Sequence, residues 1–383
     1  MEKPQQSGST EGRGEPEQRA HHSPHSTPQN LLVVGTETAV FEHASSVRAR
    51  ILAYTKSFRE VHIVVLCGPG YTPEVVEGRV HLHPTNSRLR FLRVFDALRI
   101  GKKVSAIDVV TSQDPFETGV AAWLIARKKR APLHVQVHTD FLSREYWNLS
   151  LLNRIRVFLA GFVLMRAARI RAVSDRIAHS IEEKFSLEVP ITTLPIFVDT
   201  ARFSEARPDE ALKKRFERFS FRFLVVSRLE REKNVALALR AFAASAPQES
   251  CLIIVGDGTE LVMLKGAAKQ LRIDERVFFE GTRDPAPYYA LADLVLLPSR
   301  YEGYGLVIVE ALAAGKPVLA TNVGVAREAG AIVASEDGFA EALAAWVSEG
   351  PRTAILQDYP YRNFEEYVRA YCDDIEKSVE VRG

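Results

Sequence analysis

Residues 294–320 read LVLLPSRYEGYGLVIVEALAAGKPVLA, and this stretch decides the fold. It begins with an apolar run typical of a buried parallel strand. A turn containing Gly303 and Gly305 follows, then a helical pattern, and Gly-Lys-Pro leads into the next apolar run. Strand, turn, helix and strand in this order indicate a βαβ unit. The glycines allow a ligand to approach the first N–H groups of the helix closely, and such groups form an anion site.

The same alternation of strands and helices extends along the rest of the chain. Short apolar, β-branched runs predict ten strands, at 31–35, 62–66, 107–111, 133–137, 169–173, 221–226, 251–255, 277–279, 294–297 and 317–320. The first helical stretch is expected at 45–56. This pattern predicts an α/β fold with parallel sheets covered by helices on both faces.

The chain of 383 residues is long enough for two such domains. A Pro-rich stretch without clear periodicity, at 190–208, interrupts the strands. We therefore expect two Rossmann-like, doubly wound domains at 30–200 and 201–358, followed by a C-terminal segment at 359–383. Because ligands bind beyond the carboxyl ends of the strands, two domains that face each other enclose a single cleft.

Residues 1–29 contain almost no apolar residues and predict a disordered tail. Its histidines, His21, His22 and His25, are consistent either with a metal site or with a solvated tail.

Composition excludes several classes of protein. Hydrophobic residues make up 46% and charged residues 26%, which excludes collagen-like, wholly disordered and disulfide-stapled chains. The formal net charge is only +2, with the excess of basic residues in 30–200. Cys67, Cys251 and Cys372 lie far apart, which favours a reducing compartment over a disulfide framework or a cysteine zinc site. No run of eighteen apolar residues and no secretory signal is present, so we expect a cytoplasmic protein, with contact to the inner face of a membrane as an extension.

Four motifs in the second half resemble those of the retaining GT-B glycosyltransferases of family GT4. Glu302 and Glu310 enclose seven residues and are followed by Ala-Ala-Gly-Lys-Pro-Val. The other three motifs are VVSRLEREKN at 225–234, VGDGTE at 255–260 and DLVLLPS at 293–299. Their order is that of the family, so the resemblance implies a GT-B fold and transfer of a hexose from a nucleotide sugar. Mannose from GDP-mannose is the first candidate, and a UDP-hexose is the other donor considered.

The resemblance also implies roles for individual residues. Arg228, at a strand end, and Lys233, five residues further into the following helix, would hold the diphosphate and stabilise it as it departs. Glu310 would accept hydrogen bonds from the ribose. Glu302 would orient the sugar and phosphates together with the N–H groups of Gly303, Tyr304 and Gly305. Two interpretations without a role in catalysis remain. Arg228 and Lys233 form an exposed pair of cations, or Glu302 and Glu310 are solvated carboxylates at a tight turn.

The remaining candidates are weaker. Gly256 and Gly258 would let the nucleotide approach closely, with Asp257 as a contact. His138 ends a strand where the family often has a histidine near the sugar, although a structural histidine is the alternative. Ser174 lies at a similar strand end.

The first domain departs from the family pattern, because Gly35-Thr36-Glu37-Thr38 replaces the usual Gly-Gly loop. A glycine pair lets the backbone approach the donor phosphates or the acceptor, so we expect the replacement to alter the donor–acceptor geometry on that side. By resemblance the first domain binds the acceptor, the second binds the donor, and the last helix crosses back onto the first domain.

No Asp-x-Asp motif occurs, so neither a metal nor another cofactor is expected to assist the reaction. Basic residues mixed with Leu and Phe at 88–103, 127–130 and 154–171 predict contact with an anionic membrane and a glycan or lipid-linked acceptor, or else form a solvated surface. No nucleic-acid reader motif accompanies the charge. The rival functions are a GT-B epimerase or phosphorylase and an inactive nucleotide-sugar-binding scaffold. A dinucleotide-dependent oxidoreductase is disfavoured because no strand leads into Gly-x-Gly-x-x-Gly.

Overall fold

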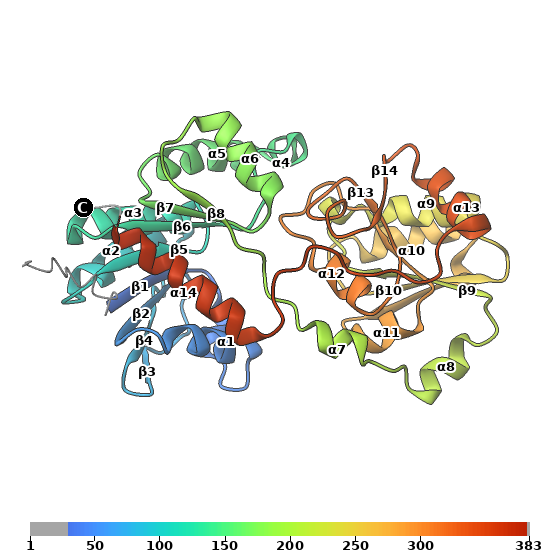
Figure 1. Ribbon diagram of the computed structural model, residues 1–383, viewed down its shortest axis with the longest axis horizontal. Coiled ribbons are helices and arrows are strands. Elements are labelled where there is room, and N and C mark those ends of the chain that lie inside the picture. The colour runs from blue at the N-terminus through green and yellow to red at the C-terminus, as the bar shows by residue number, and fades with distance from the viewer. Residues whose placement is uncertain (1–29, 381–383) are drawn as a thin grey trace, which may run out of the picture.

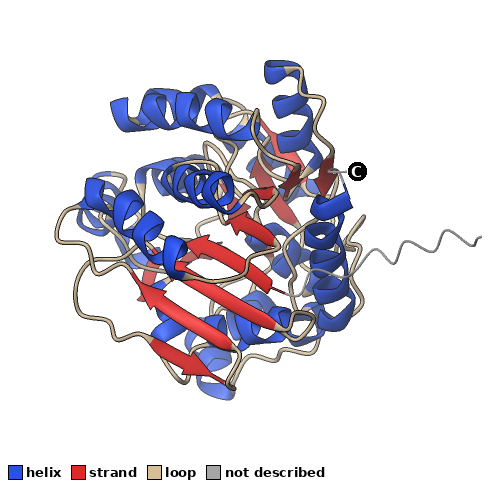
Figure 2. Ribbon diagram, turned by 90° about the vertical axis from the view of Figure 1, so that its left-hand side faces the viewer, coloured by secondary structure: helices blue, strands red, loops and turns tan. Residues whose placement is uncertain are grey.

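The computed structural model describes residues 30–380, which form two α/β domains side by side (Figure 1). The predicted tail at 1–29 and its three histidines lie outside the described residues. Each domain is built on a parallel sheet, as the alternating sequence pattern predicts, and helices flank the strands (Figure 2).

The first sheet has eight strands in the order β3-β4-β2-β1-β5-β6-β7-β8, and β3 alone runs antiparallel to its neighbour. Its strands are β1 (Asn30–Gly35), β2 (Glu60–Val65), β3 (Glu74–Val76), β4 (Val80–Pro84), β5 (Val109–Ser112), β6 (Leu133–Val137), β7 (Arg169–Ala172) and β8 (Ile191–Thr193). The helices of this domain are η1 (Thr38–Phe41), α1 (Ser46–Thr55), η2 (Arg90–Leu92), α2 (Arg93–Lys103), α3 (Glu117–Lys129), α4 (Arg144–Leu149), α5 (Leu151–Leu164) and α6 (Asp175–Phe185).

The second sheet has six parallel strands in the order β11-β10-β9-β12-β13-β14. They are β9 (Phe221–Val226), β10 (Ser250–Val255), β11 (Val277–Gly281), β12 (Leu294–Leu297), β13 (Val318–Thr321) and β14 (Ile332–Ala334). The helices are α7 (Thr200–Ser204), α8 (Glu210–Phe216), η3 (Arg231–Lys233), α9 (Val235–Ser245), α10 (Leu261–Gln270), η4 (Asp274–Arg276), α11 (Ala286–Leu291), α12 (Leu306–Ala313) and α13 (Phe339–Glu349).

Both sheets reverse their direction of strand order at a switch point. In the first domain β1 lies between β2 and β5, and in the second β9 lies between β10 and β12. Loops that leave the two strands at such a point diverge to opposite faces of the sheet, which opens a crevice for a ligand. The loops after β9 and β12 contain the motifs that resemble the GT4 family.

A strand is present near each of the ten predicted ranges, but four further strands were not predicted. β3, β8 and β14 have only three residues each, and β4 carries histidines at alternate positions and ends in proline. The stretch 190–208, whose sequence lacks clear periodicity, contains the short elements β8 and α7.

The last helix, α14 (Phe364–Glu380), packs against the sheet of the first domain, where Figure 1 shows it in red. Two segments therefore cross between the domains, one before α7 and one before α14. Tyr359 joins them, because its hydroxyl accepts a hydrogen bond from Val198 N and donates one to Val198 O.

Asp374 anchors α14 to the first domain. Its carboxylate is buried, 3.0 Å from His134 Nε2 and 2.5 Å from Arg169 Nε. Burial by itself raises the pKa of this carboxyl, but the hydrogen bonds and charges of His134 and Arg169 outweigh burial and lower the pKa to about 2. The carboxylate is therefore ionised at neutral pH and holds both partners.

None of the helices in the region 30–380 is both long enough and apolar enough to cross a bilayer.

Candidate active site

Lys233 lies on the loop that follows β9, the first strand at the switch point of the second sheet. It is the last residue of η3, and Asn234 then adopts a left-handed backbone with φ of 49° before α9 begins. Lys233 therefore lies in the short 3-10 helix after β9 and not in α9 itself. The lysine side chain is directed across the switch point, toward the loop after β12.

There the Lys233 ammonium meets the carboxylate of Glu302. Lys233 Nζ lies 2.7 Å from Glu302 Oε1, and the Ser299 hydroxyl donates to the same oxygen at 2.7 Å. Both charged side chains are largely buried. The loops after β9 and β12 thus bring together two residues that lie 69 positions apart in the sequence.

Arg228 is placed differently. Its side chain is 72% exposed and its NH2 lies 3.0 Å from Glu232 Oε1, so it shares the loop with Lys233 but is not held against Glu302. An exposed arginine at the rim of the crevice retains the freedom to turn toward an anion that enters.

Two buried polar groups beside Lys233 have no partner within the protein. Ser227 Oγ and Asn234 Nδ2 make no hydrogen bond, although both atoms are buried. An unpaired buried donor or acceptor costs roughly 1–3 kcal/mol. Unpaired groups on both sides of Arg228 and Lys233 are the pattern expected of a loop that completes its hydrogen bonds on a ligand. Both residues occur in the quoted motif, but no local pattern predicts that their side chains lack hydrogen-bond partners.

The turn after Glu302 approaches the first domain very closely. A Cβ atom on Gly303 would lie 1.8 Å from the carbonyl oxygen of His138, so only glycine fits here. Gly305 has a φ of 90° and directly precedes α12, whose first residue Leu306 lines a pocket together with His138. Tyr304 is buried, and burial raises the pKa of its hydroxyl. The mouth of α12 therefore opens toward the end of β6.

Glu310 lies about one turn into α12, away from Lys233. The hydroxyl of the buried Tyr289 donates to Glu310 Oε2 at 2.7 Å. Burial raises the pKa of Glu310, although the hydrogen bond from Tyr289 and the charge of Arg202 act in the opposite direction. The two glutamates of the motif thus have different surroundings: Glu302 pairs with a cation, and Glu310 with a phenol.

Packing within the protein explains why the loop after β10 contains glycine. A Cβ on Gly256 would lie 1.8 Å from Ser227 O, and one on Gly258 would lie 2.4 Å from Leu229 O. Asp257 accepts a hydrogen bond from Gly258 N at 2.7 Å. These residues therefore pack the backbone of the β9 loop and support the segment that carries Arg228 and Lys233.

His138 follows β6, where its Nε2 lies 3.2 Å from Gln136 Oε1. The Gln136 side chain is itself held by Arg171 at 3.0 Å and by Tyr371 at 2.9 Å. Burial, followed by the charge of Arg171, lowers the pKa of His138 to about 3. The imidazole is consequently neutral at physiological pH, which suits a hydrogen bond to a sugar hydroxyl.

Ser174 caps the N-terminus of α6 and donates from Oγ to the carbonyl oxygen of Gly303 at 3.0 Å. Its contact is therefore with the glycine turn of the second domain. Arg176 adds a second bridge between the domains, 2.7 Å from Asn322 Oδ1.

A pocket of about 630 Å³ lies at the carboxyl ends of the first domain's strands. Thr36 and Glu37 after β1, Asp114 after β5 and His138 after β6 line it. This is the switch point of the first sheet, so the loop that replaces Gly-Gly forms part of the wall.

Sequence reasoning missed two residues of this pocket. Burial raises the pKa of Asp114, and Arg93 Nε is buried without a partner. Asp114 lies two residues beyond the end of β5, close to a strand end, where polar residues often serve a site. No sequence feature singled out Arg93 as a pocket residue, because it is one of many basic residues in this region.

The chain matches two family models, each over one domain. The first, described as "Glycosyl transferases group 1", covers residues 209–359, and the second, "Glycosyltransferase Family 4", covers residues 48–202.

Curated relatives agree with these families. Alpha-monoglucosyldiacylglycerol synthase of Streptococcus pneumoniae is 28% identical over 250 residues, covering 58% of this chain and 54% of the relative. N-acetyl-alpha-D-glucosaminyl L-malate synthase of Bacillus anthracis is 32% identical over 169 residues, covering 43% of this chain and 44% of the relative. The lipopolysaccharide core biosynthesis mannosyltransferase LpsB of Rhizobium meliloti is 30% identical over 205 residues, covering 48% of this chain and 58% of the relative. The chain thus spans about half the length of these relatives.

Solved structures share the fold at low identity. Anabaena Alr3699/HepE, in complex with UDP and glucose, superposes with a TM-score of 0.65 at 18% identity, covering 92% of this chain and 97% of that one. Sucrose-phosphate synthase from Thermosynechococcus elongatus gives a TM-score of 0.69 at 16% identity, covering 92% of this chain and 94% of that one. With both domains matched in sequence and the two-domain architecture matched in structure, the chain belongs to the GT4-type glycosyltransferases and has the GT-B fold.

Proposed function

We propose that this protein transfers a hexose from a nucleotide diphosphate sugar to an acceptor, with retention of configuration and without a metal ion. The observation that carries the proposal is the buried Lys233–Glu302 ion pair at the mouth of α12, opposite His138. In the absence of donor the ammonium is neutralised by the carboxylate. A diphosphate that enters the crevice competes for Lys233, and Glu302 is then released to accept a hydrogen bond from a sugar hydroxyl.

The proposed acceleration comes from the charge that develops on the leaving group. When the bond between the sugar and the phosphate breaks, the diphosphate gains negative charge. Lys233, the N–H groups at the start of α12 and the unpaired Ser227 and Asn234 stabilise that charge. Retention follows if the acceptor attacks from the side of the departing phosphate.

The experiment that tests this proposal is donor hydrolysis by the purified chain without acceptor. We expect Lys233→Ala to lower the rate by roughly 100-fold or more, since one donor to a developing oxyanion contributes that much. Lys269→Ala is the matched control, because Lys269 is an exposed lysine on α10 of the same domain. Equal rates in the two variants would refute the role of Lys233, provided that thermal unfolding shows both to be folded.

The donor is identified with a panel of UDP- and GDP-hexoses. GDP-mannose is the first candidate from the motif resemblance, and a mannosyltransferase is among the relatives. UDP-glucose is the second, supported by neighbours in complex with UDP and UDP-glucose. Calorimetry ranks donor binding, the anomeric configuration of the product reports retention, and a chelator should leave the rate unchanged. Tight binding of one donor with no turnover of any donor would support the inactive scaffold instead.

We further propose that the pocket of the first domain binds the acceptor. It lies on the other side of the glycine turn from Lys233, and the unpaired Nε of Arg93 offers a hydrogen bond to an anionic or hydroxyl group. Arg93→Ala should raise KM for the acceptor and leave donor hydrolysis unchanged.

A lipid-linked acceptor is favoured by the surface next to this pocket. Phe91 on η2, Phe95 on α2 and Phe158 on α5 are all exposed, and arginines and lysines surround them. α3 packs against both α2 and α5, so these helices belong to one layer of the domain. Exposed aromatic residues among cations suit the interface of an anionic membrane.

Vesicle co-sedimentation tests the membrane contact. We expect binding to vesicles with anionic lipid and loss of most binding in Phe91→Ser/Phe95→Ser. Val262→Ser, at an equally exposed apolar position on α10 of the second domain, is the control. Equal binding by both variants would refute this surface.

A further inference from the structure

A group of metal-ligating side chains lies far from the proposed active site, on the edge half of the first sheet. Glu60 and His62 lie on β2 and His81 on β4. Within residues 30–380 this is the one group of three His, Cys, Asp or Glu residues whose ligand atoms all lie within 4.8 Å of one another. Glu60 is the first residue of β2, so the group lies at the opposite end of the strand from the cleft.

The strand register brings these side chains together. β2 and β4 are parallel, with His62 opposite His81 and Val64 opposite His83. Side chains on a strand alternate between the two faces, so Glu60 and His62 project from the same face, beside His81. The imidazoles of His62 and His81 stack with their centroids 4.6 Å apart.

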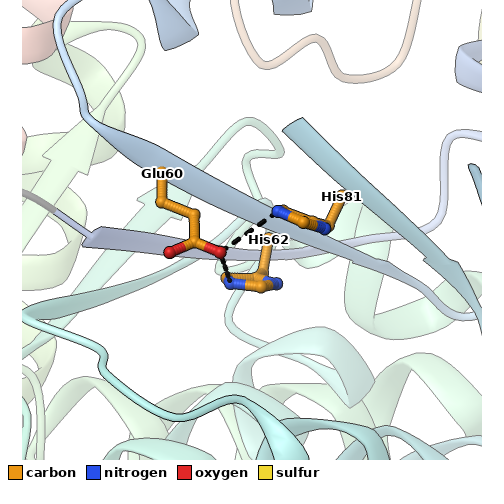
Figure 3. A group of neighbouring side chains, drawn as sticks. All are labelled: Glu60, His62 and His81. Atoms are coloured by element: carbon orange, nitrogen blue, oxygen red, sulfur yellow. Dashed lines mark ion pairs between the residues drawn. The ribbon is translucent and has the colours of Figure 1, made fainter. Parts of the chain in front are cut away.

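The carboxylate of Glu60 bridges the two rings (Figure 3). Its Oε1 lies 3.3 Å from His62 Nε2 and 3.1 Å from His81 Nε2. Two ligands of one tetrahedral zinc ion, each at the usual 2.0–2.1 Å, lie about 3.3 Å from each other. The two distances from Glu60 are therefore close to those between ligands of one zinc ion, and all three ligand atoms lie within 4.8 Å of one another.

His83 forms a hydrogen bond with the second ring nitrogen of His62, as residues around metal-binding histidines commonly do. Its Nε2 lies 3.1 Å from His62 Nδ1, which leaves Nε2 of His62 directed at Glu60. Metal-binding histidines commonly form a hydrogen bond through the second ring nitrogen, which fixes the tautomer and the ring orientation.

The composition of this face is also unusual for a parallel sheet. Central parallel strands normally carry Val, Ile or Leu on both faces, but here three histidines and a glutamate occupy adjacent positions, and His62 is 8% exposed. Burial of polar groups in this way destabilises the fold unless partners compensate, and a bound cation supplies that compensation.

From this geometry we infer that Glu60, His62 and His81 form a binding site for a divalent transition-metal ion of the Zn²⁺ type, with His83 as the supporting histidine. Two imidazoles and one carboxylate favour Zn²⁺ or Co²⁺ over Mg²⁺ or Ca²⁺, which prefer oxygen ligands alone. Glu60 is partly exposed, so water completes the coordination. The ion braces β4 and the edge strand β3 to β2, and it is independent of the proposed transfer reaction.

The experiment uses the full chain, stripped with a chelator and titrated with Zn²⁺ and with Co²⁺. We expect one equivalent of either ion to bind, the visible spectrum of four-coordinate Co²⁺, and a rise in the unfolding temperature of roughly 2–4 °C at saturating Zn²⁺. Glu60→Gln and His81→Asn should abolish all three effects. His83→Asn should weaken binding roughly 10–100-fold without abolishing it.

Two controls separate this site from other histidines. His179→Asn changes an exposed histidine on α6 and should leave binding intact. The triple change His21→Asn/His22→Asn/His25→Asn removes the histidines that precede β1 and should also leave binding intact. Binding that persists in Glu60→Gln and His81→Asn, or that disappears only in the triple variant, would overturn the inference. Glu60→Gln keeps the size of the side chain, and His81→Asn shortens a side chain that is partly exposed, so circular dichroism of both metal-free proteins should match wild type.

Discussion

Lys233 and Glu302 show what a motif predicts and what it leaves open at the scale of single residues. The motif resemblance assigned both to one donor site, Lys233 to the diphosphate and Glu302 to the sugar and phosphates. It did not predict that they would pair at 2.7 Å, that Arg228 would be 72% exposed, or that Ser227 would be left without a hydrogen bond. These outcomes depend on how two loops pack, which no local pattern encodes.

The ion pair has a consequence for stability as well as for the reaction. Because both side chains are largely buried, removal of one leaves an uncompensated charge, which destabilises proteins by roughly 3–5 kcal/mol. Activity of Lys233→Ala is therefore best measured well below its unfolding temperature.

His138 gives a pH prediction at the same scale. Its pKa is lowered to about 3 because the ring is buried and faces the charge of Arg171. It is therefore neutral at every pH above about 4 and gains no proton between pH 5 and 8. We expect the ratio of donor hydrolysis rates of wild type and His138→Asn to stay constant over that range. A ratio that falls toward 1 as the pH drops through 6.5 would show that His138 titrates normally.

At the scale of elements, the glycine turn before α12 determines how the two domains meet. Gly303 lies against the His138 carbonyl, and Ser174 donates to the carbonyl of Gly303 itself. The sequence predicted that glycine here lets a ligand approach. The structure shows a second reason, which is that the backbone of the other domain approaches from the same side.

A pair of glycine substitutions tests this contact. Gly303→Ala places a Cβ 1.8 Å from a backbone oxygen, so the turn has to shift, and we expect both lower stability and at least a tenfold loss of donor hydrolysis. Gly266 on α10 has no atom within 4 Å of its added Cβ. Gly266→Ala should therefore stabilise the protein by up to about 1 kcal/mol and leave activity unchanged. If Gly303→Ala matches Gly266→Ala in both stability and donor hydrolysis, the close approach of Gly303 to the His138 carbonyl is not required for either property.

Elements were predicted where their pattern was long and regular. The ten predicted strands contain apolar runs, whereas β3, β8 and β14 are three-residue strands that form only because a neighbour is already in place. β4 alternates Val80, His81, Leu82 and His83, a period-2 pattern that identifies a strand once histidine is allowed at its polar positions.

At the scale of the whole molecule, α14 ties the end of the chain to the first domain. Asp374 is the buried anchor, with His134 and Arg169 as partners from β6 and β7. We expect Asp374→Asn to lower the free energy of unfolding by roughly 3–5 kcal/mol, because it leaves buried partners uncompensated. Asp373→Asn changes the exposed neighbour and should have little effect. Thermal and urea unfolding of both variants measure the difference.

The sign of the pH dependence follows from the lowered pKa of Asp374. Its pKa is about 2 in the folded protein and about 3.9 in an unfolded chain, so the stabilisation is complete above about pH 5 and is progressively lost as the pH falls toward 2. The stability difference between wild type and Asp374→Asn should shrink over that range. A difference that stays constant down to pH 2 would mean that the carboxylate is not the anchor.

The sequence by itself determined the α/β class, the ten principal strands and the family, because these depend on local periodicity and on motifs that lie close together in the chain. Tertiary structure alone decided which residues meet: Lys233 with Glu302, His134 with Asp374, and Glu60 with His81. Such contacts depend on strand order and register. Two distant segments become neighbours only when the sheet has formed, and no pattern within either segment records its partner.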